Sequence, residues 1–211
     1  YQDSYNVRYR TAGSYTTYLY ESFESGLPST WTTSGLASNS GVYSGAPNTG
    51  TYMYGFVSNS TSQYLISPEL PEFEAGSTVE FYHLAYGGNA TIKVGYSSTT
   101  NAVNAFTWGS AVTVASSTSY ALYSAEVPAG TKYIGIQVTN VAGSYYLLDD
   151  FGVYSPYVEP GEWQTIDRVT TPFTITGLST ETTYEWQVQG NCSEGTTSWS
   201  TASTFTTHSL C

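Results

Sequence analysis

One run of residues indicates the architecture of this chain: Gly177-Leu178-Ser179-Thr180-Glu181-Thr182-Thr183-Tyr184-Glu185-Trp186-Gln187-Val188. In its second half Tyr184, Trp186 and Val188 alternate with polar residues, which is the pattern of a strand with one buried face. A second alternating run, Tyr5-Asn6-Val7-Arg8-Tyr9-Arg10, lies far upstream. We predict that both runs are strands of one small β-sandwich, which the chain leaves after residue 16 and re-enters at residue 158.

The composition predicts an all-β protein. The 211 residues include 21 Tyr and 20 Gly but only 1 Met. β-Branched and aromatic side chains suit pleated sheets, and no long segment repeats its apolar residues with the period of a helix. A chain of this length can bury the core of one large domain or of two ordinary domains.

The charge balance limits the partners. The chain has 16 Asp and Glu but only 5 Lys and Arg, and its formal net charge is −11. Nucleic acid is excluded because a phosphate backbone needs a basic surface, and anionic membrane surfaces are disfavoured for the same reason. No apolar run approaches the roughly 18 residues of a membrane span, so we expect no membrane insertion. Cations, basic proteins and neutral glycans are compatible partners, and the alternative is that the acidity serves solubility alone.

Residues 17–157 predict a larger β-sandwich. Short alternating runs are separated by clusters of Gly, Pro, Asn and Ser, as turns between strands require. The clearest runs cover residues 51–58, 63–67, 78–86, 91–97, 111–115, 120–127, 132–139 and 145–154. About nine strands in this region indicate two packed antiparallel sheets, and we predict a jelly roll.

The C-terminal region has a Leu-x-x-x-Thr-x-Tyr element at residues 178–184, followed by Trp199-Ser200 and by Phe205-Thr206-Thr207. These motifs resemble a fibronectin type III domain, with Thr180 in place of the family's proline. The resemblance implies that Tyr184 is a corner tyrosine whose hydroxyl bonds to nearby backbone, and that residues 5–10 are strand C.

Residues 1–16 and 158–211 together are shorter than the roughly 100 residues of such a sandwich. Its strands A and B are therefore expected to lie outside this sequence. The alternative is a tandem array in which residues 1–16 end an earlier domain.

The two cysteines are not expected to pair with each other. On this interpretation Cys192 ends strand F and Cys211 follows strand G, at opposite ends of a hairpin and about 20 Å apart. A disulfide needs Cα atoms within about 7 Å. We expect Cys192 to pair with a cysteine ahead of strand A and Cys211 to pair in a following domain; two free thiols are the alternative.

Four motifs follow one another in the middle region: Phe23-Glu24-Ser25-Gly26-Leu27-Pro28-Ser29-Thr30-Trp31, Tyr64-Leu65-Ile66-Ser67-Pro68-Glu69-Leu70, Val127-Pro128-Ala129-Gly130-Thr131-Lys132-Tyr133 and Leu148-Asp149-Asp150-Phe151. They resemble the cleaved adhesin domains, jelly rolls related to the MAM class in surface proteases and adhesins of Bacteroidetes. The resemblance covers residues 20–154. One departure is that residues 32–50 are rich in Ser, Gly and Asn where the family often has an Asp-Gly-rich stretch.

The carboxylate of Asp149 is expected to point inward, because it shares one side of its strand with Leu147, Phe151 and Val153. A buried carboxylate is costly unless it is paired or bound to a cation. With so few Lys and Arg residues, a hard cation with oxygen ligands is its natural partner.

The same reasoning gives a candidate metal site. If the first and last strands are neighbours, Glu24 and Glu21 come near Asp149 and Asp150, and the resemblance likewise implies a structural Ca²⁺ there. The alternative is that Asp149 bonds to backbone amides or to a tyrosine hydroxyl while Asp150 faces water.

Catalysis is not expected. Asp149 and Asp150 are adjacent in the sequence, so on a strand they point to opposite faces and cannot flank one scissile bond. His83 lies in a strand whose other residues serve packing, and it is interpreted as a histidine with satisfied hydrogen bonds and not as a catalytic base. Nucleophile elbows, redox Cys pairs, zinc motifs and phosphate loops are absent from the sequence.

Aromatic residues in or near turns are better candidates for binding, because their rings stack on sugars and anchor protein interfaces at low entropic cost. The candidates are Tyr43, Tyr52, Tyr54, Tyr86 and Trp108. The alternative for each is packing against neighbouring strands.

We therefore predict a non-catalytic adhesion or binding module of a larger secreted or cell-surface bacterial protein, with host protein or glycan as its ligand and with flanking domains. The first alternative is a carbohydrate-binding accessory region of a polysaccharide-degrading enzyme. The second is a structural stalk.

Overall fold

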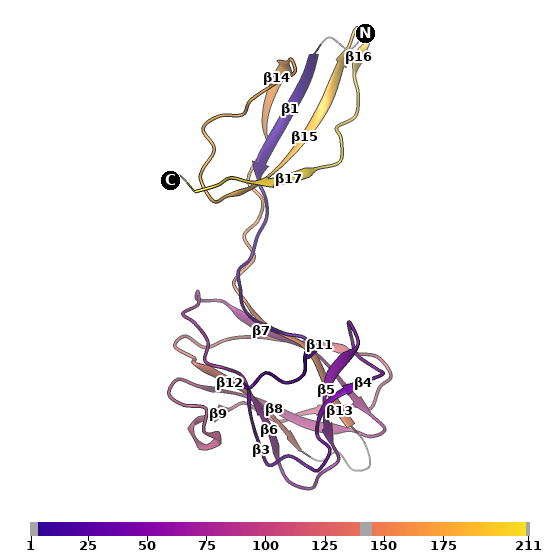
Figure 1. Cartoon of the computed structure of the whole chain (residues 1–211), viewed down its shortest axis with the longest axis vertical. Helices are drawn as coiled ribbons and strands as arrows, with labels where there is room; N and C mark the ends of the chain where they lie inside the picture. The colour runs from indigo at the N-terminus through magenta and orange to yellow at the C-terminus, as the bar shows by residue number, and fades with distance from the viewer. Residues whose placement is uncertain (1–3, 140–144, 210–211) are drawn as a thin grey trace. The chain divides into compact units, whose positions relative to one another are not determined.

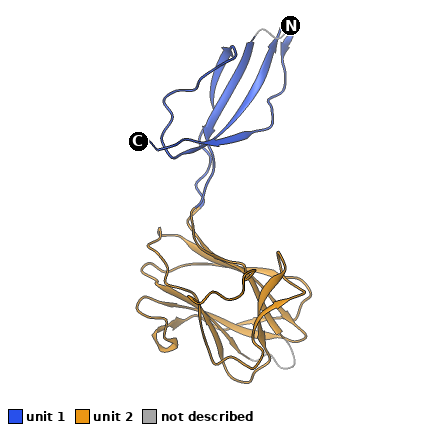
Figure 2. Ribbon diagram, viewed as in Figure 1, with its two compact units in different colours: residues 1–15, 157–211 blue, residues 16–156 orange. Residues whose placement is uncertain are grey.

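The structure is a computed structural model, and it describes residues 4–139 and 145–209. The chain divides into two compact units: Tyr1–Tyr15 with Tyr157–Cys211 form unit 1, and Thr16–Pro156 form unit 2 (Figure 2). Apart from one 3-10 turn at Val103–Ala105, every regular element in the described ranges is a strand. All the named strands pair antiparallel, so the protein is all-β, as the composition predicts.

Unit 1 is a single five-stranded sheet in the order β14-β1-β15-β16, with β17 also paired to β15. Its strands are β1 (Ser4–Thr11), β14 (Gln164–Val169), β15 (Thr183–Cys192), β16 (Gly195–Thr196) and β17 (Ser203–Thr206). Strand β1 lies between β14 and β15, and its Tyr9 stands opposite Trp186 (Figure 1). The two alternating runs at the distant ends of the sequence are thus neighbours in one sheet.

The corner tyrosine of unit 1 behaves as predicted. Tyr184 is buried and its ring stacks on Phe205 at 5.7 Å. Its hydroxyl accepts a hydrogen bond of 3.0 Å from the backbone N–H of Ser179. Cys192 ends β15 as an exposed free cysteine, whereas Cys211 lies outside the described residues.

The two faces of the unit 1 sheet differ in character. On one face the Arg8 guanidinium lies between the rings of Trp163 and Trp199, at 4.5 and 4.4 Å, and Arg10 stacks on Trp163 at 4.3 Å. The other face is apolar and borders a hollow of about 730 Å³. The side chains around that hollow include Tyr5, Val7, Val169, Phe173, Trp186 and Val188.

Unit 2 is a sandwich of two six-stranded sheets. One sheet has the order β10-β8-β12-β6-β3, with β9 on β8; the other has the order β11-β7-β13-β5-β4, with β2 on β13. The strands of the first sheet are β3 (Thr32–Ser34), β6 (Gln63–Ile66), β8 (Ala90–Ser97), β9 (Thr107–Trp108), β10 (Val112–Val114) and β12 (Tyr133–Thr139). Those of the second are β2 (Thr17–Glu21), β4 (Gly41–Ser44), β5 (Tyr52–Val57), β7 (Thr78–Tyr86), β11 (Ala121–Glu126) and β13 (Tyr145–Tyr154).

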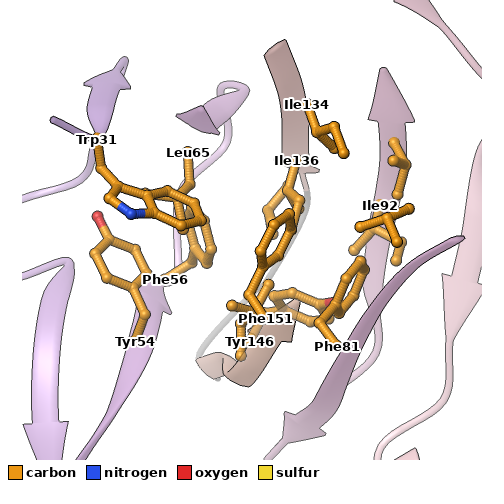
Figure 3. Packing of buried hydrophobic residues seen from close by; sticks show 14 of the residues in the cluster. Trp31, Tyr54, Phe56, Leu65, Phe81, Ile92, Ile134, Ile136, Tyr146 and Phe151 are labelled. Carbon is orange, nitrogen blue, oxygen red and sulfur yellow. The ribbon is translucent and has the colours of Figure 1, made fainter. Parts of the chain in front are cut away.

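The core of unit 2 lies between these two sheets and is rich in aromatic rings (Figure 3). Phe81 and Phe151 stack at 5.9 Å, and Trp31 meets Phe151 edge-on at 5.1 Å. His83 packs against Phe81 and Tyr146, but its Nδ1 atom is buried without a hydrogen-bond partner among the described residues. The predicted packing is confirmed, whereas the prediction that its hydrogen bonds are satisfied is not. Removing one such core ring typically costs 3–5 kcal/mol, so these contacts dominate the stability of unit 2.

A β-bulge in β13 decides where its carboxylates point. Asp149 pairs with Tyr82 and Gly152 pairs with Glu80, so Asp150 and the following residue together face one position of β7. Asp150 adopts a φ of 49°. Such a bulge resets the in-and-out alternation of its strand.

The prediction that Asp149 points inward with Phe151 and Val153 is therefore wrong. Leu148 and Phe151, on either side of the bulge, both enter the core, whereas Asp149 remains on the outer face with Leu147. It is nevertheless fully buried, at 0% exposure, because a loop covers it.

A candidate binding face on the outer side of one sheet

The outer face of the β11-β7-β13-β5-β4 sheet carries a small apolar cluster. Met53, Leu84 and Leu147 form its buried floor, and the rings of Tyr43 and Tyr120 pack against them. The cluster follows from strand alternation, because these side chains point away from the core on neighbouring strands. This face is therefore apolar underneath and aromatic on top.

Three tyrosines form a row across this face, which we call the tyrosine row: Tyr43, Tyr86 and Tyr145. Tyr86 and Tyr145 stand directly opposite each other on β7 and β13, and they are 55% and 42% exposed. The ring of Tyr43, on β4, meets that of Tyr145 edge-on at 6.2 Å. Strand β5 lies between them, and its Gly55 leaves room for the Tyr43 ring, since a Cβ there would lie 2.8 Å from that ring.

A hollow of about 550 Å³ adjoins Tyr86 and is lined also by Gly87, Ser116, Ser117 and Thr118. None of these lining side chains is charged. The Ser117 backbone N–H donates to the Ala85 carbonyl at 2.8 Å, which fixes this segment beside the end of β7. One end of the tyrosine row thus opens onto hydroxyl groups and bare backbone.

Loop 45–51, between β4 and β5, covers the other end of the face, and Asp149 holds it in place. The Oδ2 atom of Asp149 accepts backbone N–H bonds from Asn48 at 2.8 Å and from Thr49 at 3.2 Å. Its Oδ1 atom accepts the N–H of Asp150 at 2.8 Å. On the far side the Tyr120 hydroxyl donates to the Ala46 carbonyl at 2.8 Å.

Asp150 adds side-chain bonds to the same loop. It accepts the Thr49 hydroxyl at 2.8 Å, the Asn48 side-chain amide at 2.9 Å and the Tyr20 hydroxyl at 2.7 Å. Asp150 is 8% exposed and does not face water. Asp149 thus bonds to backbone amides, as the alternative to a metal site predicted, whereas Asp150 does not face water as that alternative also expected.

Burial raises the pKa values of three ionisable side chains around loop 45–51, those of Asp149, Tyr120 and Tyr20. Burial raises the pKa of Asp149, and the neighbouring Asp150 charge adds to the rise, while the amide bonds oppose it. Burial also raises the pKa of Tyr120, with further contributions from Asp149 and Asp150. The pKa of Tyr20 rises for the same reason and because its hydroxyl donates to Asp150.

The four predicted calcium ligands do not converge. Glu24 accepts the backbone N–H groups of Thr51 and Tyr52 at 2.9 and 2.8 Å, and Glu21 accepts that of Phe23 at 2.6 Å. Asp149 and Asp150 are engaged by the loop. Carboxylate oxygens suit a hard cation, yet within residues 4–139 and 145–209 no group of three acidic, His or Cys side chains could hold a metal ion. In the structure the four carboxylates accept hydrogen bonds from protein donors, and calcium binding at these residues stays a prediction.

The five predicted ligand-contacting aromatics are in different environments. The prediction that Tyr54 contacts a ligand is wrong, because its side chain is 1% exposed and packs between Phe23 and Phe56 in the core. Trp108 is half-buried on the opposite sheet, where it stacks on Phe106 at 5.2 Å. Tyr52 is exposed at the start of β5, and it lies on the same side of that strand as the core residue Tyr54.

Of that set, Tyr43 and Tyr86 lie on the same outer face. Tyr145, which was not among the predicted residues, contacts Tyr43 and stands opposite Tyr86. The sequence gives no sign that Tyr145 is a surface ring. Simple alternation puts it on the side of Leu147 together with Phe151, which is buried, and only the bulge separates the two and leaves Tyr145 on the outer face.

Comparison with known proteins supports the fold of unit 2. The chain is similar to the K3 cleaved adhesin domain of Lys-gingipain from Porphyromonas gingivalis, with 21% identity over 65% of this chain and 98% of that one, and a TM-score of 0.56. The chain is also similar to the K1 cleaved adhesin domain of the same protein, with 22% identity over 66% of this chain and 98% of that one, and a TM-score of 0.56. Only unit 2 is large enough to account for such a share, so its predicted adhesin-like sandwich fold is confirmed.

A third similar structure is the carbohydrate-binding module TmCBM61, solved in complex with β-1,4-galactotriose, with 23% identity over 65% of this chain and 97% of that one, and a TM-score of 0.48. No family profile matches the chain, and no curated protein matches it significantly. In the described part of the chain, no helix has the length and apolarity to cross a membrane.

Proposed function

We propose that the chain is a non-catalytic binding module of a larger extracellular protein, and that unit 2 meets its ligand with the tyrosine row. The observation that carries this proposal is the pair of exposed rings, Tyr86 and Tyr145, which stand directly opposite each other on β7 and β13. Tyrosines offer a large contact area and lose little conformational freedom on binding.

The ligand in this proposal is a host protein or a glycan, and the setting is a secreted or cell-surface bacterial protein. The cleaved adhesin fold of unit 2 supports this setting. A carbohydrate-binding accessory role in a polysaccharide-degrading enzyme is the second candidate, and the uncharged, hydroxyl-lined hollow beside Tyr86 favours it.

Unit 1 is proposed to be the split fibronectin type III-like spacer that carries unit 2. The central place of β1 and the bond between Tyr184 and Ser179 support this assignment. A sheet buries its apolar face under a second layer, and we propose that strands from flanking polypeptide cover the apolar hollow of unit 1.

The groups that could perform chemistry are otherwise occupied, which supports a non-catalytic role. Burial lowers the pKa of His83, whose ring packs between Phe81 and Tyr146. Both carboxylates of the adjacent pair Asp149 and Asp150 bind loop 45–51.

The test is to screen the labelled chain against a glycan array and against immobilised matrix and blood proteins. We expect the native chain to bind one ligand class and the double variant Tyr86→Ala/Tyr145→Ala to lose at least tenfold in affinity. The matched control is Tyr157→Ala, which removes a similarly exposed tyrosine from unit 1. Binding that survives in the double variant would refute the proposed face, and silence on all surfaces would leave a structural stalk.

A further inference from the structure

We infer that the tyrosine row takes a neutral oligosaccharide that runs across the strands, with one sugar ring in the hollow beside Tyr86. The inference rests on the proposed function and specifies its ligand class. It combines three observations: the spacing of the rings, the chemistry of the hollow and the charge of the surroundings.

The ring spacing defines a path for an extended ligand. Tyr86 and Tyr145 are cross-strand partners, and Tyr43 lies two strands beyond β13, in contact with Tyr145. The Tyr43 and Tyr145 rings are 6.2 Å apart, and the strands of Tyr145 and Tyr86 lie about 4.8 Å apart, so the row spans roughly 11 Å. A chain of a few sugar rings fits this span. Because Tyr43 meets Tyr145 edge-on, the rings that remain for stacking on the apolar sides of sugars are the exposed Tyr86 and Tyr145.

The hollow beside Tyr86 supplies hydrogen-bonding groups for the hydroxyls of a stacked sugar. A sugar ring presents hydroxyls around its rim, and each of them must exchange its water for another hydrogen-bonding group. Ser116 and Thr118 provide hydroxyls that can both donate and accept, and Gly87 leaves the backbone uncovered. The Ser117 hydroxyl already bonds to the Ser119 backbone and shapes the segment. An aromatic ring beside a few polar groups is the usual composition of a small-molecule site.

The charges exclude the anionic members of this ligand class. The chain carries a net charge of −11, which repels a polyanion. Among the described residues, no cationic side chain lines the hollow. The nearby carboxylates of Asp149 and Asp150 are buried under loop 45–51 and engaged there, so they are not free to recruit a basic ligand either.

A protein ligand fits the same surface less well. A standard protein interface buries about 800 Å² per partner around an apolar centre. Here the apolar floor is already covered, since Leu84 and Leu147 are only 5% and 6% exposed. Separate ring faces above a closed floor favour a flat, hydroxylated ligand.

The experiment is isothermal titration of the full chain with neutral β-linked hexose oligosaccharides of two to six units, and with an acidic oligogalacturonide of six units. We expect affinity to rise from the disaccharide to the tetrasaccharide and then to level off, with the acidic ligand at least tenfold weaker. Tyr86→Ala should weaken binding about tenfold, because it removes one of the stacking rings. Thr118→Val, which exchanges a hydroxyl for a methyl group, should weaken it about threefold, and Tyr157→Ala should leave it unchanged.

Three failures are distinguishable. If a protein binds through Tyr86 and Tyr145 but no neutral oligosaccharide does, the sugar inference is overturned and the proposed function stands. If an oligosaccharide binds equally well to Tyr86→Ala and to the native chain, the assigned site is wrong. If no ligand of either class depends on the row, the proposed function falls as well. Circular dichroism of each variant confirms that this exposed position has not unfolded the protein.

Discussion

Replacing Asp149 should release loop 45–51 and destabilise the strands of unit 2 beneath it. The Asp149 side chain is fully buried and accepts three backbone N–H bonds, from Asn48, Thr49 and Asp150. Asp149→Ala removes every one of these acceptors. The loop then keeps the Asp150 bonds, the contact between Tyr120 and Ala46, and the bond from the Thr51 N–H to Glu24.

The expected loss follows from these bonds. A hydrogen bond to a charged group contributes about 1.5–3 kcal/mol, so three bonds would give up to about 9 kcal/mol if nothing replaced them. Two terms reduce this value. Thr49 is exposed, so water can reach the freed loop amides, and the raised pKa of Asp149 shows that burying its charge is itself unfavourable. We expect a net loss of about 3 kcal/mol for Asp149→Ala, and about half of that for Asp149→Asn, which keeps one acceptor oxygen.

The assay must report on unit 2 alone, because an unfolding curve of the whole chain mixes two units. Hydrogen exchange measured by mass spectrometry on peptides of β5 and β13 gives their opening free energies separately. EDTA is present throughout so that no cation contributes. Glu126→Gln, an exposed carboxylate at the end of β11, is the matched control. A change below about 0.5 kcal/mol in Asp149→Ala would refute the view that this carboxylate holds the loop.

Three further predictions concern unit 2. Burial lowers the pKa of His83 in the folded protein, so as the pH falls the unfolded chain binds a proton at this residue before the folded chain does. Unit 2 should therefore lose stability as the pH falls below about 6.5. In His83→Gln the urea midpoint should change less between pH 7.5 and 5.5 than it does in the native chain. The Tyr146 hydroxyl is buried with no partner among the described residues, so Tyr146→Phe should raise the free energy of unfolding by about 1 kcal/mol; a loss of stability would show that a bound water satisfies it. Calcium at Glu24, Glu21, Asp149 and Asp150 stays a prediction: millimolar Ca²⁺ should raise the melting temperature of unit 2 by several degrees over EDTA, and an unchanged value would remove calcium from the account.

The strands with strict alternation could be predicted from the sequence. Residues 78–86 and 132–139 were expected as strands and are β7 (Thr78–Tyr86) and β12 (Tyr133–Thr139). Val79 and Phe81 in β7, and Ile134, Ile136 and Val138 in β12, recur at every second position, which is the strongest local signal for a half-buried strand. Strand β4 (Gly41–Ser44) was missed, because it is short, lies in a Ser/Gly/Asn-rich stretch and gains its structure from pairing with β5.

The candidate site could be predicted only in part, for two physical reasons. Alternation shows which residues share a face but not which face meets the other sheet, and for this reason the buried Tyr54 and the outer Tyr43 looked alike. The bulge at Asp150 then reverses the alternation within β13 and separates Asp149 from Phe151. A bulge has no firm sequence signal when the residue with positive φ is not glycine.

The most direct test of the binding face is NMR of the tyrosine rings, carried out on ¹³C-labelled protein during titration with the ligand that the screen identifies. The account predicts that the rings of Tyr43, Tyr86 and Tyr145 shift and saturate together, at the affinity measured independently. Tyr64, on the opposite sheet, and Tyr184, in unit 1, should not shift. Saturating shifts at Tyr64 or Tyr184 with none in the tyrosine row would contradict the account.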